Sequence, residues 1–214
     1  MNERIAYLMG VLNSDGFISV KKIGQRVRHI LTVAVGEKSL PMIEKLQEIF
    51  SNEFNRHVKI QFMETNEYGT KIYRIELSLT RLLPLFTNLG IKKGNIPIPI
   101  QSDVKLFSAY MGGLIDGDGT VCVKRRKSYP QCVVRIIDGK KSEELKQHIE
   151  HFLNCKCWIE PIKKSSYHFP TKNSIVGYRH CFYVSKKNKY IFKKLVLPYI
   201  QINHKNKMLN DFVN

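Results

Sequence analysis

The chain has 214 residues, 43% of them apolar and 25% charged, which is typical of a soluble globular protein of one large or two small domains. Its charge is unusual, since 35 Lys and Arg face only 18 Asp and Glu, and such an excess makes nucleic acid the first partner to consider. A membrane partner is not expected, because there is neither an apolar run of roughly 18 residues nor a basic amphipathic helix.

The first predicted element is an apolar helix with small residues that ends in Asp-Gly, YLMGVLNSDG at residues 7–16. Apolar side chains then alternate in two strands, FISVKK and RVRHILTVAV. A helix is predicted to begin at Ser39, a natural N-cap with Pro41 in the first turn. Two more strands, HVKIQFME and KIYRIELSL, and a helix near residues 80–89 complete a first half at residues 1–93.

A linker at residues 94–103, where two prolines and a glycine exclude a regular helix, leads to a second half at residues 104–214. This half begins with a stronger copy of the first helix, YMGGLIDGDG, so that Asp118 lies 103 residues after Asp15. The strands TVCVKRR and YPQCVVRIID follow, and the next helix begins at Ser142, again 103 residues after Ser39. Strands KCWIEPIKK and VGYRHCFYVS, a helix near residues 186–197 and a last helix near 204–213 complete the half.

The alternation of apolar residues supports a duplication of the whole domain. Under the offset of 103 the predicted core residues Val27, Leu31 and Val33 correspond to Pro130, Val134 and Ile136. A slip of one residue would reverse every side chain, so agreement over two strands is informative. We therefore predict two halves, each with the element order α-β-β-α-β-β-α.

The two acidic helix ends suggest a metal site. Gly10, Gly112 and Gly113 would let the two apolar helices pack closely, which brings Asp15 and Asp118 to the same end of the pair. Carboxylates placed together repel unless a cation joins them. Oxygen ligands at an open site suit Mg²⁺ or Mn²⁺, and a pair of metals roughly 3.5–4 Å apart can act on a phosphodiester.

The segments Met111–Gly119 (MGGLIDGDG) and Leu8–Gly16 (LMGVLNSDG) resemble the LAGLIDADG motif of homing endonucleases, and the duplicated order is similar to the single-chain members with two motifs. The resemblance implies a monomer with an α+β fold, in which a pseudo-twofold axis relates two halves that each carry an antiparallel sheet. The two sheets would form a saddle on a long double-stranded DNA site, with the motif helices packed at the centre. The resemblance further implies a staggered double-strand cut with divalent metal, typically for insertion of a mobile intron or intein.

The resemblance also implies roles for individual residues. The eighth motif position, the metal-binding acid of the family, is Asp15 and Asp118 here. The sixth is Asn13 in the first copy, where Asp is usual, and Asp116 in the second. That position is generally not a ligand, so Asn13 does not indicate loss of activity.

Family members further place a basic or polar residue near the metals from the end of each half. In the first half the segment IKKG places Lys92 and Lys93 there, and Lys92 is taken as this residue. In the second half it would be His204 or Lys205, with Lys205 favoured. These lysines would organise water or stabilise developing charge.

Strand residues out of phase with the core are predicted to contact DNA, because Arg, Gln and Lys can pair with base edges in the major groove. In the first half they are Ser19, Lys21, Arg26, Arg28, Thr32, Lys59, Gln61, Arg74 and Glu76. In the second half they are Lys124, Arg126, Tyr129, Gln131, Arg135, Arg179 and Tyr183. Residues 104–214 carry 21 basic and 8 acidic side chains against 14 and 10 in residues 1–103, so the second half is expected to make more phosphate contacts.

The cysteines favour an intracellular, reducing compartment. All five lie after residue 121, and an odd number argues against a disulfide framework. The amino-terminal segment does not have the pattern of a signal peptide. His148, His151, Cys155 and Cys157 have the residue types of a zinc site, but their spacing fits no standard finger and packing explains them better.

Two other functions are compatible with the sequence. One is a binding protein on the same fold, either a maturase with host intron RNA as its partner or a DNA-binding regulator. Loss of the motif carboxylates would favour it, and both are present. The other is a basic structural protein, which predicts no metal dependence. Phosphate contacts are common to all three functions, so salt-dependent binding does not separate them.

Overall fold

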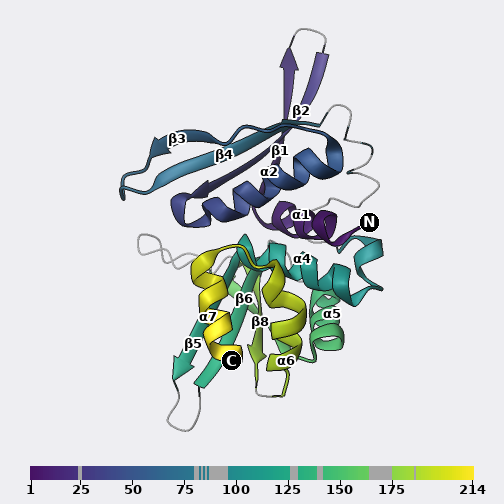
Figure 1. The fold of residues 1–214 in the computed structure, drawn as a ribbon, viewed down its shortest axis with the longest axis vertical. Helices are drawn as coiled ribbons and strands as arrows, with labels where there is room; N and C mark the ends of the chain where they lie inside the picture. Colours follow the sequence, from purple (N-terminus) through teal and green to yellow (C-terminus); the bar gives the residue numbers. More distant parts are fainter. Residues whose placement is uncertain are drawn as a thin grey trace.

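A computed structural model describes residues 1–23, 26–79, 82, 84, 86, 96–125, 130–138, 142–163, 175–185 and 187–214. Two α+β halves lie one above the other, and two helices run side by side between them (Figure 1). These central helices are α1 (Glu3–Ser14) and α4 (Val104–Asp116). None of the helices in the described part of the chain has the length and apolar character needed to span a membrane.

The first half follows the predicted order. After α1 come β1 (Gly16–Ile23), β2 (Arg26–Gly36), a 3-10 turn η1 (Glu37–Ser39), α2 (Leu40–Phe54), β3 (Gln61–Thr65) and β4 (Lys71–Ser78). The strands form one antiparallel sheet in the order β1-β2-β4-β3. Leu31, Val33 and Ile75 are buried on one face of this sheet, with α2 packed against β2 and β4.

The second half has the same sheet order, β5-β6-β8-β7. Its elements are a 3-10 turn η2 (Ile98–Ile100), α4, β5 (Gly119–Arg125), β6 (Pro130–Asp138), α5 (Glu143–Leu153), β7 (Cys157–Lys163), β8 (Ile175–Val184), α6 (Lys189–Ile191), η3 (Phe192–Val196), η4 (Leu197–Tyr199) and α7 (Asn203–Val213). Gly16 pairs with Val33 and Gly119 with Ile136, so the offset of 103 holds for strand register as well.

The two predicted helix caps differ. Ser142 is the N-cap of α5, and its hydroxyl accepts a hydrogen bond from the Leu145 backbone N–H at 3.2 Å. Ser39 makes no such bond, because the 3-10 turn η1 runs directly into α2 and gives Ser39 φ −103° and ψ 9° instead of extended backbone. Ser39 is thus the N-cap of α2 by position, as predicted, but without the side-chain hydrogen bond expected of a serine there.

Three other expectations need correction. Val27 was assigned to the core but is 46% exposed, because the end of the β1–β2 hairpin extends beyond the helices (Figure 1). The third strand begins at Gln61 rather than His57, since the Val58 carbonyl accepts a hydrogen bond from the Gln47 side chain at 2.6 Å. Lys59 therefore precedes the strand.

The helix predicted near residues 186–197 is irregular. A short α6 is followed by the π-helical turn η3 and the 3-10 turn η4. Pro198 lies in η4, and because proline has no N–H it cannot continue the α-helical hydrogen bonds. The helix predicted near residues 80–89 lies largely outside the described residues.

Candidate active site

The site is built where α1 and α4 meet backbone to backbone. A Cβ on Gly10 would overlap the Tyr110 carbonyl oxygen and lie 2.9 Å from the Leu114 nitrogen. A Cβ on Gly113 would overlap the Tyr7 carbonyl oxygen and lie 2.8 Å from the Val11 nitrogen. These contacts are the same under the offset of 103, so the motif helices are related by the pseudo-twofold axis. Only glycine allows this approach at either position.

Gly112 was expected to contribute to the close packing of the two motif helices, but it packs against another segment. A Cβ at this position would come within 2.5 Å of the Tyr199 Cβ. Gly112 therefore makes room for the carboxyl-terminal segment, while Gly10 and Gly113 make the seam between the halves.

The carboxyl ends of the two helices lie against each other. Asp15 is the C-cap of α1, and its N–H donates to the Val11 carbonyl at 2.8 Å. Gly117 ends α4 in the same way, with its N–H on the Gly113 carbonyl at 3.0 Å. A Cβ on Gly117 would overlap the Ser14 hydroxyl and lie 3.2 Å from Asp15 Oδ2. The Asp15 carboxylate thus lies against the turn that carries Asp118.

Asp116, at the sixth motif position, is 1% exposed and enclosed by protein donors. Its Oδ2 accepts hydrogen bonds from the Tyr7 hydroxyl at 2.8 Å and the Gln201 N–H at 2.7 Å, and its Oδ1 from the Ile202 N–H at 3.1 Å. Burial raises the pKa of Asp116, while these hydrogen bonds and the charge of Lys205 oppose the rise. Burial and the neighbouring Asp116 raise the pKa of Tyr7.

In the first motif the sixth residue also contacts a tyrosine of the other half, but it is an amide instead of a carboxylate. The Asn13 side-chain amide donates to the Tyr110 hydroxyl at 2.9 Å. Each half therefore offers a tyrosine to the sixth motif position of the other half. Sequence reasoning missed both tyrosines, although they are themselves 103 residues apart and precede each motif by the same distance.

Lys205, near the start of α7, reaches the same helix end. Its ammonium donates to the carbonyls of Ile115 at 2.8 Å, Asp116 at 2.7 Å and Gly117 at 3.2 Å. Burial lowers the pKa of Lys205, whereas the charges of Asp116, Asp15 and Asp118 raise it. The lysine predicted from the sequence is thus electrostatically coupled to both motif carboxylates.

The other candidates for this position are less informative. His204 is largely exposed, and the partial loss of water around its ring, followed by the charges of Lys205 and Lys38, lowers its pKa. Lys92 lies outside the described residues.

The residues present are compatible with a divalent cation. Asp15 and Asp118 offer only oxygen, the donor type that Mg²⁺ and Mn²⁺ prefer. Gly117 keeps free the space in which a Cβ would press on Asp15. Within the described residues no group of three or more His, Cys, Asp or Glu could hold a metal by itself. A cation at this site would therefore need water or phosphate oxygens as further ligands.

Two of the residues with the chemistry of zinc ligands, His148 and Cys155, contact polar groups of the protein. His148 Nδ1 is 2.8 Å from the Glu144 carbonyl oxygen, and the Cys155 sulfur is 3.0 Å from the Asn188 amide nitrogen. Burial raises the pKa of Cys155 and of Cys157 to about 12. Cys155 and Cys157 are buried in the second half, whereas His148 is partly buried and His151 is exposed.

The predicted DNA-contacting residues of the first sheet share one face. Register pairs Lys21 with Arg28 and Thr32 with Glu76, opposite in phase to the buried Leu31 and Val33. Ser19, Arg26, Gln61 and Arg74 occupy positions of the same phase. The Arg74 guanidinium donates to the Gln61 side chain at 3.2 Å and pairs with Glu76 at 3.4 Å.

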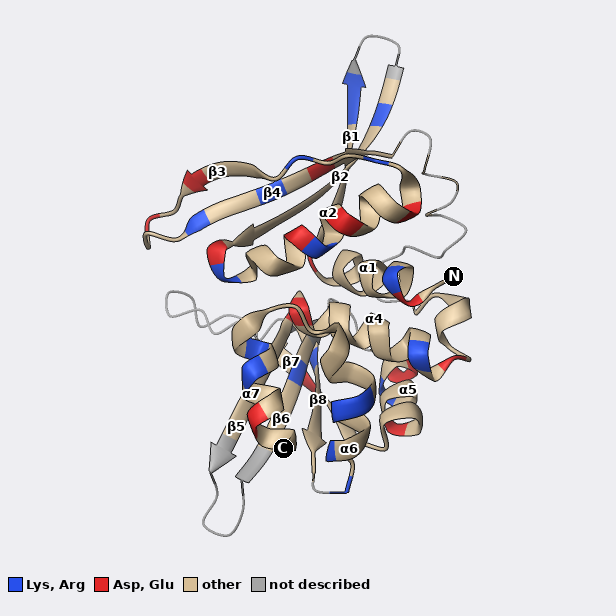
Figure 2. Ribbon diagram, in the orientation of Figure 1, with Lys and Arg blue, Asp and Glu red and all other residues tan. Residues whose placement is uncertain are grey.

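The second sheet has an equivalent outer face. Register pairs Lys124 with Gln131, Arg135 with Cys181, and Arg179 with Glu160. Tyr183 is also in this phase, whereas Arg126 and Tyr129 lie outside the described residues. Figure 2 shows basic residues on strands of both sheets, with acidic residues among them.

Two residues of this face were missed by sequence reasoning. The Trp158 ring centroid is 4.7 Å from that of Tyr183, and its N–H donates to Glu160 at 2.7 Å. Glu160 also pairs with Arg179 at 3.7 Å. Alternation along KCWIEPIKK places Trp158 and Glu160 on one face, so the signal was present in the sequence.

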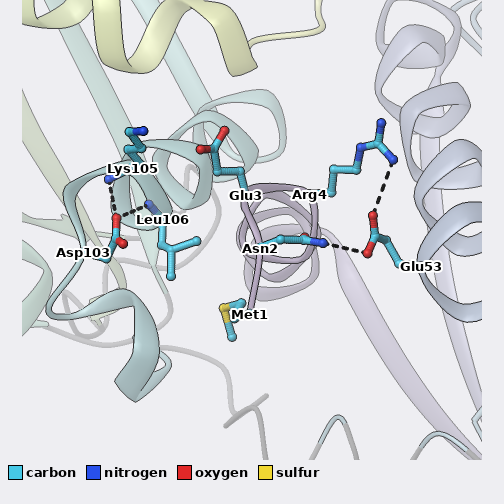
Figure 3. A pocket seen from close by; sticks show the side chains of 8 residues that line it. All are labelled: Met1, Asn2, Glu3, Arg4, Glu53, Asp103, Lys105 and Leu106. Atoms are coloured by element: carbon cyan, nitrogen blue, oxygen red, sulfur yellow. Dashed lines mark hydrogen bonds and ion pairs between the residues drawn. The ribbon is translucent and has the colours of Figure 1, made fainter.

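A hollow of about 530 Å³ is lined by residues at the amino-terminal ends of α1 and α4 (Figure 3). Asp15 and Asp118 lie at the opposite, carboxyl-terminal ends of these helices. Several of the charged and polar groups of the hollow are bound to one another or to the helix ends. Glu53 accepts hydrogen bonds from Asn2 at 2.7 Å and Arg4 at 3.5 Å, and Asp103 accepts from the first N–H groups of α4. The hollow shows no arrangement suited to chemistry.

Comparison with known proteins gives structural matches only. No protein-family model matches the chain, and no curated protein matches it. The structure of I-DmoI in complex with DNA and Ca superposes with TM-score 0.63 at 18% identity, covering 98% of this chain and 97% of that one. The I-LtrWI LAGLIDADG homing endonuclease bound to target DNA gives 0.62 at 13% identity, covering 99% and 89%. The LAGLIDADG meganuclease I-AabMI bound to uncleaved DNA gives 0.60 at 14%, covering 99% and 89%.

These likenesses span nearly the whole chain. At such low identity they establish the fold: the chain has the two-sheet α+β architecture of the LAGLIDADG homing endonucleases. The fold predicted from the duplicated sequence is confirmed.

Proposed function

We propose that the protein is a site-specific double-strand DNA endonuclease of the LAGLIDADG homing type, acting as a monomer with Mg²⁺ or Mn²⁺. The observation that carries this proposal is the contact between the two motif ends. Asp15 lies against the turn bearing Asp118. Both residues follow helices of the two halves that meet at a close contact formed by Gly10 and Gly113. The matched structures support it, since they include complexes with target DNA and with Ca, Mn or Mg.

Asp15 and Asp118 would hold the metal, one carboxylate from each half. When bound, a divalent ion would supply a water nucleophile and neutralise charge that develops on the phosphate. The protein supplies position, because the Gly10–Gly113 seam fixes the distance between the helices and Gly117 lacks the Cβ that would lie 3.2 Å from Asp15 Oδ2. Residues 1–93 and 104–214 would be the two halves of one catalytic unit, joined by the linker at 94–103.

The outer faces of the two sheets would bind the DNA. Lys21 and Arg28 would neutralise phosphates near the end of the β1–β2 hairpin. Arg74 and Arg179 would read bases, because each guanidinium is already oriented by a side chain on the neighbouring strand, Gln61 or Glu160. Orienting an arginine before binding reduces the entropy that it loses in the complex.

The proposal is tested by cleavage of a randomised duplex DNA library with Mg²⁺, followed by sequencing of the ends. The wild-type protein should cut both strands with a stagger within one long sequence, and EDTA should abolish the cuts. A D15N/D118N double variant is the matched control, since it should retain the bound sequence without cutting it. If the wild type binds one sequence selectively but does not cleave it with any of the divalent metals tested, the maturase or regulator is favoured instead. If it binds DNA without sequence preference, a structural protein is favoured.

A further inference from the structure

Two charged side chains, one from each helix, join the carboxyl end of α4 to the amino end of α7. Asp116 belongs to α4, and its carboxylate accepts the N–H groups of Gln201 and Ile202, immediately before α7. Lys205 belongs to α7, and its ammonium donates to the last carbonyls of α4. Each helix thus supplies the charge that the other helix end requires.

This arrangement occupies the whole hydrogen-bonding capacity of the lysine. An ammonium has three N–H donors, and all three are directed at main-chain oxygens between 2.7 and 3.2 Å away. Donation to a water or to a phosphate oxygen would require release of a carbonyl at the end of a buried helix. Leaving such a buried group unsatisfied is costly.

The carboxylate of Asp116 accepts three hydrogen bonds. Beyond the two backbone N–H groups it accepts the hydroxyl of Tyr7, which belongs to the first half. The turn Asp116–Gly117 leads directly into Asp118 and is also the turn against which Asp15 lies. Displacement of α7 would therefore move the turn that carries Asp118 and change its contact with Asp15.

We propose that Asp116 and Lys205 form a reciprocal cap between α4 and α7, and that Lys205 is a positioning residue that fixes the Asp118 turn, not a donor to water or substrate. The inference rests on the proposed endonuclease function for its effect on cleavage. The cap itself does not depend on that function. It differs from the role suggested by the sequence, in which the lysine organises water.

Amide hydrogen exchange tests the cap in the free protein, without metal or DNA. In K205M the amides of Gln201 and Ile202 and those of residues 116–118 should exchange about tenfold faster or more, as expected when buried charge-assisted hydrogen bonds are lost. D116N should accelerate exchange at Gln201 or Ile202, because an amide side chain presents one acceptor where the carboxylate presents two. K207M and D211N change exposed residues of the same helix and should leave these amides as in the wild type.

Cleavage of the selected target provides the second measurement. K205M and D116N should lower the rate together, by about tenfold or more, and K205R should recover part of it because arginine can also donate to the carbonyls. Loss of cleavage in K205M with unchanged exchange would overturn the proposal and make Lys205 a donor in the reaction. Unchanged exchange in D116N would also overturn it. If the wild type cuts no DNA, the proposed function fails while the exchange data still decide on the cap.

Discussion

At the scale of single residues, the two motifs differ most clearly at the sixth position. A carboxylate at Asp116 can only accept, so Tyr7 donates to it. An amide at Asn13 can donate, and it does so to Tyr110. The same cross-half contact is therefore kept with the direction of the hydrogen bond reversed. Asp116 then has capacity left for the backbone of residues 201–202, which ties the second motif to the carboxyl-terminal helix.

The identity of the motif acids could be predicted from the sequence, but their partners could not. The repeat marked Asp15 and Asp118 because both copies end in Asp-Gly. The repeat gave no information about Lys205 beyond its place after the last strand. Every residue has a backbone carbonyl, so the sequence does not show which carbonyls accept hydrogen bonds from this lysine. Arg74 and Arg179 were found by strand phase, and their partners Gln61 and Glu160 follow from register, which the sequence does not specify across strands.

Helix capping gives a prediction for single residues. Ser142→Ala removes the hydrogen bond to the Leu145 N–H and should lower the free energy of unfolding by about 1 kcal/mol. Ser39→Ala is the matched control at the equivalent position, where no side-chain cap bond exists, and should change it much less. Urea unfolding followed by circular dichroism measures both. Equal losses in the two variants would contradict the structural difference between the caps.

At the scale of elements, alternation and the offset of 103 were sufficient to predict the order of helices and strands. They failed where tertiary contacts override local pattern. The hydrogen bond from Gln47 to the Val58 carbonyl delays β3, and the reach of the β1–β2 hairpin beyond the helices leaves Val27 exposed. Alternation of apolar residues predicts the buried face of a strand correctly only along the part of the strand that another element covers.

The seam between α1 and α4 gives a prediction at this scale. Gly10→Ala or Gly113→Ala would force a methyl group into the opposing backbone, which cannot rotate away. Either change should destabilise the protein by about 1–3 kcal/mol and slow cleavage, since the separation of the motif ends depends on the seam. Gly36→Ala is the control, because its added Cβ meets only the Thr70 methyl at 3.2 Å. Wild-type stability in both seam variants would show that the helices do not touch as described.

At the scale of the whole molecule, two halves of one fold carry different outer faces. The positions of Gln61 and Glu76 in the first sheet correspond by register to Glu160 and Cys181 in the second. The second half also carries more basic residues, 21 against 14. Two unlike faces on a pseudo-twofold axis should recognise two unlike half-sites.

The target is therefore expected not to be a palindrome. Duplexes in which either half-site is repeated in inverted orientation should bind at least a hundredfold more weakly than the selected target, since several mismatched base pairs cost about 1–3 kcal/mol each. Gel-shift titration at fixed salt measures this, with a scrambled duplex of the same composition for non-specific binding. Equal affinity for an inverted repeat would show that the two faces read the same bases.

The central claim is that Asp15 and Asp118 form one composite centre. Its most direct test is the cleavage rate of each DNA strand, measured with a separate label on each strand of the selected target, in D15N and in D118N. A shared centre predicts that either substitution lowers the rate on both strands by about a hundredfold or more, the size of effect seen when a group that stabilises transition-state charge is removed. If either variant still cuts one strand at the wild-type rate, the carboxylates act independently and the account is contradicted.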